Sequence, residues 1–360
     1  MARKRKLTTY PTSRGDKDFK NMPFNSADQL VFAGLSYTFF ERFYTHPETL
    51  KSIGERILSL GFIGAGFREK GDMDILSSCM KSKVYSSAIV YAPYGSIDES
   101  SLKQFGAVTF LFDDFAVVAF RGTDSSFIGW QEDISLSYRE VIPAMDDGCN
   151  YLKDILLAID LPIYITGHSK GGTIALFSYL SLSKEEQERV LCVYNNDGPG
   201  LCIPRLQRCK DSKVVTIVPE SSVVGMLLYH AKEDYVVKAS GLGAMQHNLY
   251  SWYVSDESLL YGTGRTRCSL FMEKAALDWV SVISFDERLA LNNFVFSFLK
   301  ASGDISFRGF LLRFIKKLNV FVSFLMKAPK EDKKLVKKTI YMFFISIFAH
   351  KGIKQIPQEI

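Results

Sequence analysis

The stretch Gly167-His168-Ser169-Lys170-Gly171-Gly172 lies between two segments of different character. The apolar run at residues 161–165 predicts a short buried strand, and residues 173–180 have the apolar spacing of a helix. Ser169 is therefore expected on a sharp strand-to-helix turn, where the glycines let strand and helix approach closely. On such a turn the hydroxyl projects from the sheet, and the helix N-terminus favours developing negative charge. The stretch thus predicts a serine nucleophile.

Strand-like and helix-like segments alternate on both sides of this turn. Residues 107–112 and 115–120 are apolar runs separated by two aspartates, a pattern that predicts two strands joined by a tight hairpin. Residues 146–159 have helical periodicity, and valine-rich runs follow at 190–194 and 213–218. The alternation is typical of an α/β fold, with a mostly parallel sheet and helices on both faces.

The flanking segments are less regular. Residues 25–40 and 47–60 have helical spacing, so a helical preface is expected before the sheet. Residues 234–239 and 250–254 are shorter strand-like runs, which we expect near the sheet edge.

Composition limits the class of protein. With 360 residues and 47% hydrophobic content, the chain can bury a large core without disulfides. The six cysteines include no C-x-x-C pair and no ligand-like spacing to histidine, so we expect no zinc site. The basic start leads into polar residues and does not have the form of a signal peptide. A reducing, cytoplasmic location is the expectation.

The C-terminal tail is strongly basic. From residue 307 to the end, twelve Lys and Arg stand against three Asp and Glu, a balance of +9 in a chain of net charge +5. Apolar residues repeat at helical spacing from Phe307 to Leu325, and a basic run at 333–338 leads into an apolar run at 339–349. The latter is too short to cross a bilayer, which needs about 20 residues. The tail is either an amphipathic helix pair packed on the main domain or an interfacial pair that binds anionic lipid at the inner membrane face.

Four motifs in order resemble a known family. Phe120-Arg121-Gly122-Thr123 after a strand, together with the stretch around Ser169, resembles the paired motifs of the class 3 lipases, a branch of the α/β-hydrolases. The strings at 196–200 and 218–225 are similar to an uncharacterised bacterial branch of that group. The resemblance covers roughly residues 24–254. It implies an α/β-hydrolase fold, and the helical spacing of the flanking segments adds a helical N-terminal preface and a helical basic C-terminal appendage. The expected regions are a basic tail at 1–23, an α/β-hydrolase domain at 24–285 and a helical basic region at 286–360.

The resemblance also implies roles for three residues. Ser169 matches the nucleophile, and the backbone amides of Thr123 and Lys170 match the two donors of the oxyanion hole. Two N–H groups aimed at the carbonyl oxygen would stabilise the tetrahedral intermediate of acyl transfer.

The general base is sought among five histidines. The order of nucleophile, acid and histidine in this fold excludes His46. His168 adjoins the nucleophile and would point away from it, and His350 lies in the basic tail. His230 and His247 remain, and His247 follows a glycine-containing loop after a strand, where this fold delivers its histidine. We expect His247 to be the base, with His230 as the alternative.

The acid departs from the family pattern. Class 3 lipases usually carry Asp two residues before the Val-Pro pair, and Thr216 occupies that position here. Asp197 follows the run at 190–194, at the carboxyl end of the sheet, and looks like a relocated acid. Glu220 and Asp234 are the alternatives, and a site without an acid is a further one.

The segment after Thr123 has mixed character. Asp124, Glu132 and Asp133, with Lys170 next to the nucleophile, place charges near the expected site. The aromatic residues Phe127 and Trp130 fit an acyl pocket, a small lid or ordinary core.

Together these patterns predict a serine hydrolase that cleaves a carboxylic ester, lipase-like or esterase-like, without a metal or an organic cofactor. A peptidase or a thioesterase would use the same triad, and a non-catalytic binding protein that keeps the fold is the alternative from another class. The expected partner is a small-molecule or lipid ester, with an anionic membrane surface as a second partner of the tail. No nucleic-acid partner is expected.

Overall fold

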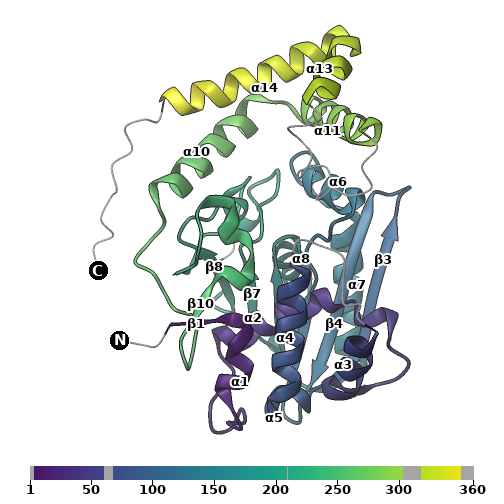
Figure 1. Cartoon of the computed structure of the whole chain (residues 1–360), viewed down its shortest axis with the longest axis vertical. Coiled ribbons are helices and arrows are strands. Elements are labelled where there is room, and N and C mark those ends of the chain that lie inside the picture. The colour runs from purple at the N-terminus through teal and green to yellow at the C-terminus, as the bar shows by residue number, and fades with distance from the viewer. Residues whose placement is uncertain (1–3, 61–67, 209, 303–317, 350–360) are drawn as a thin grey trace.

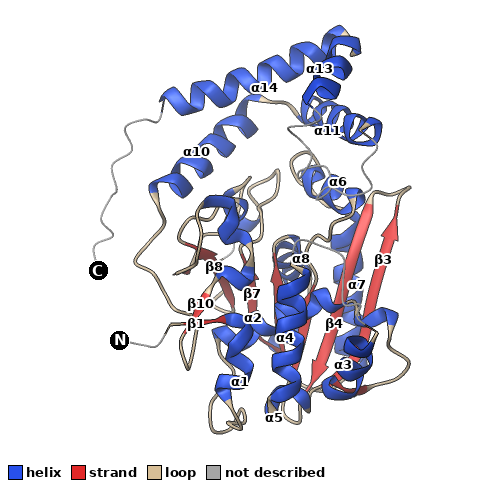
Figure 2. Cartoon of the chain, viewed as in Figure 1, coloured by secondary structure: helices blue, strands red, loops and turns tan. Residues whose placement is uncertain are grey.

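The computed structural model describes residues 4–60, 68–208, 210–302 and 318–349. The strands found there are β1 (Arg5–Lys6), β2 (Glu48–Thr49), β3 (Ile89–Asp98), β4 (Lys103–Leu111), β5 (Ala116–Phe120), β6 (Ile163–His168), β7 (Val190–Asn196), β8 (Val214–Pro219), β9 (Tyr235–Val237) and β10 (Tyr253–Val254). Within the described residues, β2 to β9 form one sheet in sequence order (Figure 2). Pairing is antiparallel from β2 to β5 and parallel from β5 to β9. The predicted α/β fold with a mostly parallel sheet is confirmed.

Helices cover both faces of this sheet (Figure 1). The α-helices of the described residues are α1 (Tyr10–Arg14), α2 (Ser26–Leu35), α3 (Leu50–Ser59), α4 (Glu69–Lys81), α5 (Lys83–Ser86), α6 (Phe127–Ser135), α7 (Pro143–Ala158), α8 (Lys170–Leu180), α9 (Lys184–Glu188), α10 (Arg267–Val282), α11 (Phe285–Ala301), α13 (Leu318–Lys327) and α14 (Lys330–Ala349).

The middle strand β5 shows how two cores form. Successive side chains of a strand point to opposite faces. Val117 and Ala119 pack in one apolar cluster with α2, α3 and α4, whereas Val118 and Phe120 pack in another with α7 and α8. Every residue of β5 is buried, as expected for a strand covered on both faces.

The hairpin predicted before the site is present. β4 and β5 pair antiparallel, with Ala107 opposite Phe120 and Leu111 opposite Ala116. The strand that pairs with the other side of β4, β3, was not expected from the sequence. Most of its residues are partly exposed, and a register shift between Tyr91 and Tyr94 interrupts its alternation.

Two expectations about the flanking segments are confirmed, each with an addition. The preface is helical apart from the two-residue strands β1 and β2. The run at 250–254 lies near the sheet edge, where Trp252 forms a bridge to Ala239 just after the edge strand β9. Its strand β10 pairs with β1 in a separate two-stranded sheet, with Arg5 opposite Val254. Such pairing between distant segments leaves no local sequence pattern.

The residues before Phe24 pack on the main domain. Leu7 and Tyr10 are fully buried. The Arg14 guanidinium is also buried and lies 2.7 Å from the carboxylate of Asp28 in α2. This N-terminal segment is therefore attached to the fold through apolar contacts and a buried ion pair.

The C-terminal helices lie together beyond one end of the sheet (Figure 1). Phe321 of α13 contacts Phe298 of α11, with ring centroids 5.0 Å apart, and Phe324 contacts Phe294 at 5.4 Å. Phe321, a member of the predicted apolar stripe, thus packs on protein. The earlier part, from Phe307 to Phe314, lies outside the described residues.

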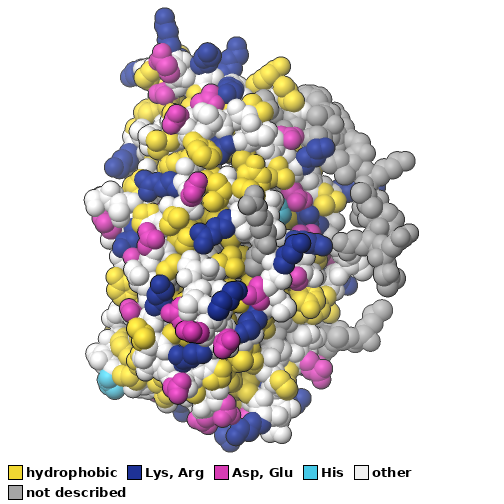
Figure 3. All heavy atoms as spheres, turned by 180° about the vertical axis from the view of Figure 1, so that it is seen from behind, with side chains coloured by type: hydrophobic (Ala, Val, Ile, Leu, Met, Phe, Trp, Pro, Cys, Tyr) yellow, Lys and Arg dark blue, Asp and Glu magenta, His cyan; other side chains and the backbone are white. Residues whose placement is uncertain are grey.

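None of the helices in the described ranges is long and apolar enough to cross a membrane. On the face shown in Figure 3, Lys and Arg side chains are interspersed with Asp and Glu and with apolar side chains.

Candidate active site

Ser169 occupies the turn between β6 and α8. Its backbone has φ 59° and ψ −136°, a conformation that costs a non-glycine residue of the order of 1–3 kcal/mol. The turn is tight enough to require glycine at its flanks. A Cβ on Gly171 would lie 2.3 Å from the carbonyl oxygen of Phe120, and one on Gly167 would lie 2.1 Å from that of Gly171. The strained turn holds the serine at the carboxyl end of the parallel strands.

Two consecutive hydrogen bonds connect Ser169 to His247 and His247 to Asp197. The distance from His247 Nε2 to Ser169 Oγ is 2.9 Å, and that from His247 Nδ1 to Asp197 Oδ2 is 2.7 Å. A carboxylate only accepts, so Nδ1 carries the proton and Nε2 can accept from the serine hydroxyl. Asp197 is fully buried and Ser169 is 8% exposed.

The carboxylate of Asp197 is held by its surroundings. Its Oδ1 accepts hydrogen bonds from the Ser222 hydroxyl and from the amide of Gly225, the latter at 3.2 Å. A Cβ on Gly225 would lie 2.3 Å from this oxygen, so glycine is required there. Asp197 also has a positive φ of 53°, just after β7. These contacts leave Oδ2 aimed at the imidazole.

The alternative residues lie elsewhere. Asp234 accepts a hydrogen bond from the amide of Thr216 at 2.7 Å. His230 is 3.3 Å from the carboxylate of Glu273, which has its pKa lowered to about 2 chiefly by that histidine. The side chain of Glu220 lies near Gly262. Among the described residues, Asp197 provides the carboxylate that is hydrogen-bonded to His247.

Thr123 and Lys170, the residues expected to supply the oxyanion-hole amides, belong to segments next to Ser169. Lys170 is the first residue of α8, a position whose N–H has no carbonyl partner within the helix. Gly122 brings the segment after β5 against the turn, because a Cβ there would be 3.1 Å from the Cβ of Ser169 and 2.5 Å from the carbonyl oxygen of His168. The next residue, Thr123, therefore lies beside the nucleophile.

The Lys170 side chain is buried away from solvent. Its ammonium group donates to Glu132 at 2.7 Å and to both the carbonyl and the side-chain oxygen of Gln104 at 2.8 Å. Glu132 also accepts from the amides of Gln104 and Ala144. This fully buried ion pair ties the start of α8 to α6 and β4, so the lysine does not present a charge to substrate.

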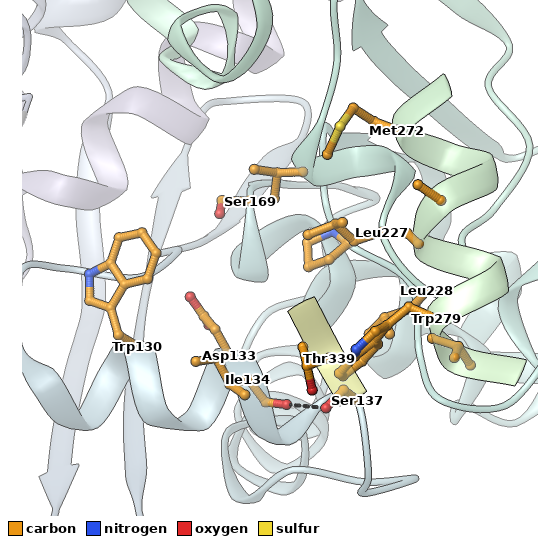
Figure 4. A pocket seen from close by; sticks show the side chains of 15 residues that line it. Trp130, Asp133, Ile134, Ser137, Ser169, Leu227, Leu228, Met272, Trp279 and Thr339 are labelled. Atoms are coloured by element: carbon orange, nitrogen blue, oxygen red, sulfur yellow. Dashed lines mark hydrogen bonds between the residues drawn. The ribbon is translucent and has the colours of Figure 1, made fainter. Parts of the chain in front are cut away.

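Asp133 is the acidic side chain that reaches the site. It accepts a hydrogen bond from the Thr123 hydroxyl at 2.5 Å, and its other oxygen lies 3.9 Å from the Lys170 ammonium. Burial raises the pKa of Asp133 to about 6, against the lowering influence of Lys170. In Figure 4 its side chain projects into the cavity beside Ser169.

A second histidine, His168, forms a hydrogen bond with the backbone of His247. His168 is fully buried, and its Nε2 lies 2.7 Å from the backbone carbonyl oxygen of His247. Burial, then the neighbouring His247, lower the pKa of His168 well below its usual range, so the ring is neutral. Because a carbonyl only accepts, Nε2 carries the proton, and Nδ1 accepts from the Tyr37 hydroxyl at 3.0 Å. The sequence indicated that His168 points away from the serine, but not that it holds the other histidine.

The loop that carries His247 has its own anchor. The side chain of Gln246 accepts from the amide of Ser221 at 2.7 Å and donates to the carbonyl of Gly241 at 2.9 Å. The Trp252 indole N–H donates to the Gln246 carbonyl at 2.8 Å. The sequence did not predict these contacts, because they link separate loops.

We expect Tyr37→Phe to lower kcat about tenfold with little change in KM. The change leaves His168 Nδ1 without its donor and permits the tautomer that no longer holds the His247 carbonyl. The free energy of unfolding should fall by about 1–3 kcal/mol. The matched control is Tyr151→Phe, because the Tyr151 hydroxyl is also buried but bonds Thr109 at 2.9 Å. Equal kcat in the two variants, measured by steady-state kinetics, would assign Tyr37 to stability alone.

An apolar cavity of about 450 Å³ adjoins Ser169 (Figure 4). Its walls come from α6, from the segments around Pro199 and Leu227, from α10, and from Thr339 of α14. Trp130 of α6 is one of the lining residues. Among the residues that the structure describes, no three His, Cys, Asp or Glu are grouped so that they could hold a metal ion.

Residues 79–297 match the Mbeg1-like family. This chain belongs to the Mbeg1-like family. The comparison with curated proteins found no match. Among solved structures, this Mbeg1-like chain is similar to the M37 lipase, with 16% identity, coverage of 55% of this chain and 68% of that one, and a TM-score of 0.36. A fungal lipase is 14% identical, and the match covers 65% of this chain and 83% of that one, with a TM-score of 0.39. Lip2 lipase from Yarrowia lipolytica is 11% identical, and the match covers 67% of this chain and 85% of that one, with a TM-score of 0.36.

Proposed function

We propose that this chain is a serine hydrolase that cleaves carboxylic esters with an apolar acyl group. The observation that carries the proposal is the line of hydrogen bonds from Ser169 through His247 to Asp197. A hydroxyl on a strained turn, bonded to an imidazole that a buried carboxylate orients, is the arrangement that activates serine as a nucleophile.

In the first half of the reaction, Ser169 Oγ attacks the ester carbonyl carbon while His247 Nε2 takes the hydroxyl proton. The carbonyl oxygen becomes an oxyanion, which the amides of Thr123 and Lys170 stabilise. One donor of this kind is worth roughly 3–4 kcal/mol of barrier. The intermediate then collapses, and the imidazolium gives its proton to the departing alkoxide. An alcohol leaves, and Ser169 carries the acyl group.

In the second half, water replaces the alcohol. His247 Nε2 takes a proton from the water as its oxygen attacks the acyl carbon, and the same two amides hold the new oxyanion. Collapse breaks the bond to Ser169 Oγ, which recovers its proton from His247. A carboxylic acid leaves, and Asp197 balances the imidazolium charge in both halves.

The preference for an apolar acyl group is supported by the cavity. Leu227, Met272 and Trp279 are among its apolar walls, and it begins at Ser169. Its volume of about 450 Å³ lies within the usual range of ligand pockets, about 300–1,000 Å³. The order of the four sequence motifs, which resembles that of the class 3 lipases, favours the same class of reaction.

A fluorophosphonate probe tests the proposal. We expect the purified full-length protein to form a covalent adduct, and peptide mass spectrometry to locate it on Ser169. Steady-state assays should show hydrolysis of p-nitrophenyl esters. An unlabelled Ser169 together with no hydrolysis of short or long acyl esters would favour a non-catalytic binding protein. Labelling with cleavage of thioesters or peptides alone would keep the nucleophile and change the substrate.

A further inference from the structure

C-terminal helices form one wall of the cavity, on the side opposite the α/β domain. α10 contributes five lining residues, among them the small Ala275 and Ala276 and the large Trp279. Thr339 of α14 completes the wall. The family match ends at residue 297, so α14 lies beyond it. In Figure 4, Trp279 and Thr339 lie away from Ser169.

These helices are joined to the segment directly after α6, on the opposite wall. The Arg288 guanidinium of α11 is buried and donates to the carbonyl of Ser137 at 2.6 Å and to that of Val280. Asn292 donates to the Tyr138 hydroxyl at 2.6 Å. Buried hydrogen bonds of a charged group are among the stronger ones. The two walls are therefore held at a fixed separation.

An aromatic cluster reinforces this link. Phe298 of α11 contacts Phe321 and Phe324 of α13, with ring centroids 5.0 and 5.6 Å apart. Phe127 and Trp130 of α6 pack against the same cluster. Trp130 thus contacts the cavity and the C-terminal helices at once.

α14 is fixed next to the residue that lines the cavity. The Lys338 ammonium lies 2.8 Å from both carboxylate oxygens of Glu287 in α11, and this contact lowers the pKa of Glu287. Leu335 and Val336 are buried on the same helix. Thr339 follows Lys338 directly and is positioned by it.

We propose that α10, α11, α13 and α14 form a cap that binds the acyl chain of the substrate and sets its length, with Ala276 and Thr339 as specificity-determining residues. The proposal rests on the function proposed above. The small side chain of Ala276 leaves room for methylene groups, and Thr339 and Trp279 limit the far end. A packed cap, unlike an open groove, excludes chains that exceed the cavity.

The full-length protein and three variants should be compared on p-nitrophenyl esters from butyrate to palmitate. Ala276→Phe and Thr339→Phe fill the cavity, so kcat/KM on the longest ester accepted by the wild type should fall about tenfold to 100-fold relative to butyrate. The control is Val282→Phe, because Val282 is on α10 but 44% exposed. It should keep the wild-type profile. An unchanged profile in both cavity variants would overturn the proposal.

Two measurements separate failure of the cap from failure of the function. Displacement of bound cis-parinaric acid by fatty acids of rising length reports on the cavity without any turnover, and Thr339→Phe should shift it toward shorter acids. Thr339→Ala enlarges the cavity and should shift it toward longer ones. If displacement does not depend on length in any variant, the cap proposal is wrong even where the fluorophosphonate labels Ser169. If displacement shifts while labelling is absent, the cap holds and the hydrolase function fails.

Discussion

Replacement of Ser169 by alanine is expected to abolish both ester hydrolysis and fluorophosphonate labelling. Loss of the nucleophile in a serine hydrolase lowers kcat by about a million-fold, because the histidine and the carboxylate act only through the serine hydroxyl. The turn already accommodates a Cβ at this position, so the fold should persist. Circular dichroism and a chain-length series of p-nitrophenyl esters would measure the two effects.

The control for this variant is Ser178→Ala. Ser178 is buried in α8, the helix that follows Ser169, and its hydroxyl has no hydrogen-bond partner among the described residues. Its loss should leave labelling and turnover close to the wild type. Labelling that persists in Ser169→Ala, or an equal loss in both variants, would remove Ser169 from the proposed mechanism.

Asp197→Asn is expected to lower kcat about ten-thousand-fold while the fold remains intact. An asparagine amide can donate to His247 Nδ1, and this favours the tautomer whose Nε2 carries the proton. Nε2 then cannot accept the proton of Ser169. The hydrogen bond from Gly225 can persist on the amide oxygen, so the thermal unfolding temperature should change little.

The control is Glu220→Gln, since Glu220 also follows a strand of the sheet but lies near Gly262. Its kcat should stay within a few-fold of the wild type. A loss at Glu220 that equals or exceeds the loss at Asp197 would move the acid to the later strand and leave Asp197 as a turn residue.

Local patterns predicted the centre of the molecule. The glycines around Ser169 mark a turn at which neighbouring backbone segments approach within a few ångströms. The apolar runs of β5, β6 and β7 are long enough to identify buried strands. The sequence also pointed to His247 and Asp197, whose side chains the structure brings into contact. Their catalytic roles stay predictions.

Contacts between distant segments could not be predicted in this way. The buried pair of Lys170 and Glu132 involves two charges that local patterns place on the surface. The support of His247 by His168 depends on the fold of the loop after β9. Thr339 reaches the cavity only because α14 packs on α10 and α11.

Only part of what the sequence predicts for the C-terminal tail is described by the structure. The described aromatic residues of α13 pack on α11, which agrees with the helix-pair interpretation. Binding to anionic lipid and a cytoplasmic location stay predictions, as do the three regions assigned from the sequence.

The pairing of β1 with β10 has a consequence for the order in which the molecule is assembled. Val254 stands 249 positions after its partner Arg5 in the sequence, so it leaves the ribosome much later. The loop with His247 immediately precedes β10. During synthesis, Ser169 can therefore reach its turn early, whereas the base is fixed only when the two ends of the main domain meet. A nascent chain carries the nucleophile before it has the means to activate it.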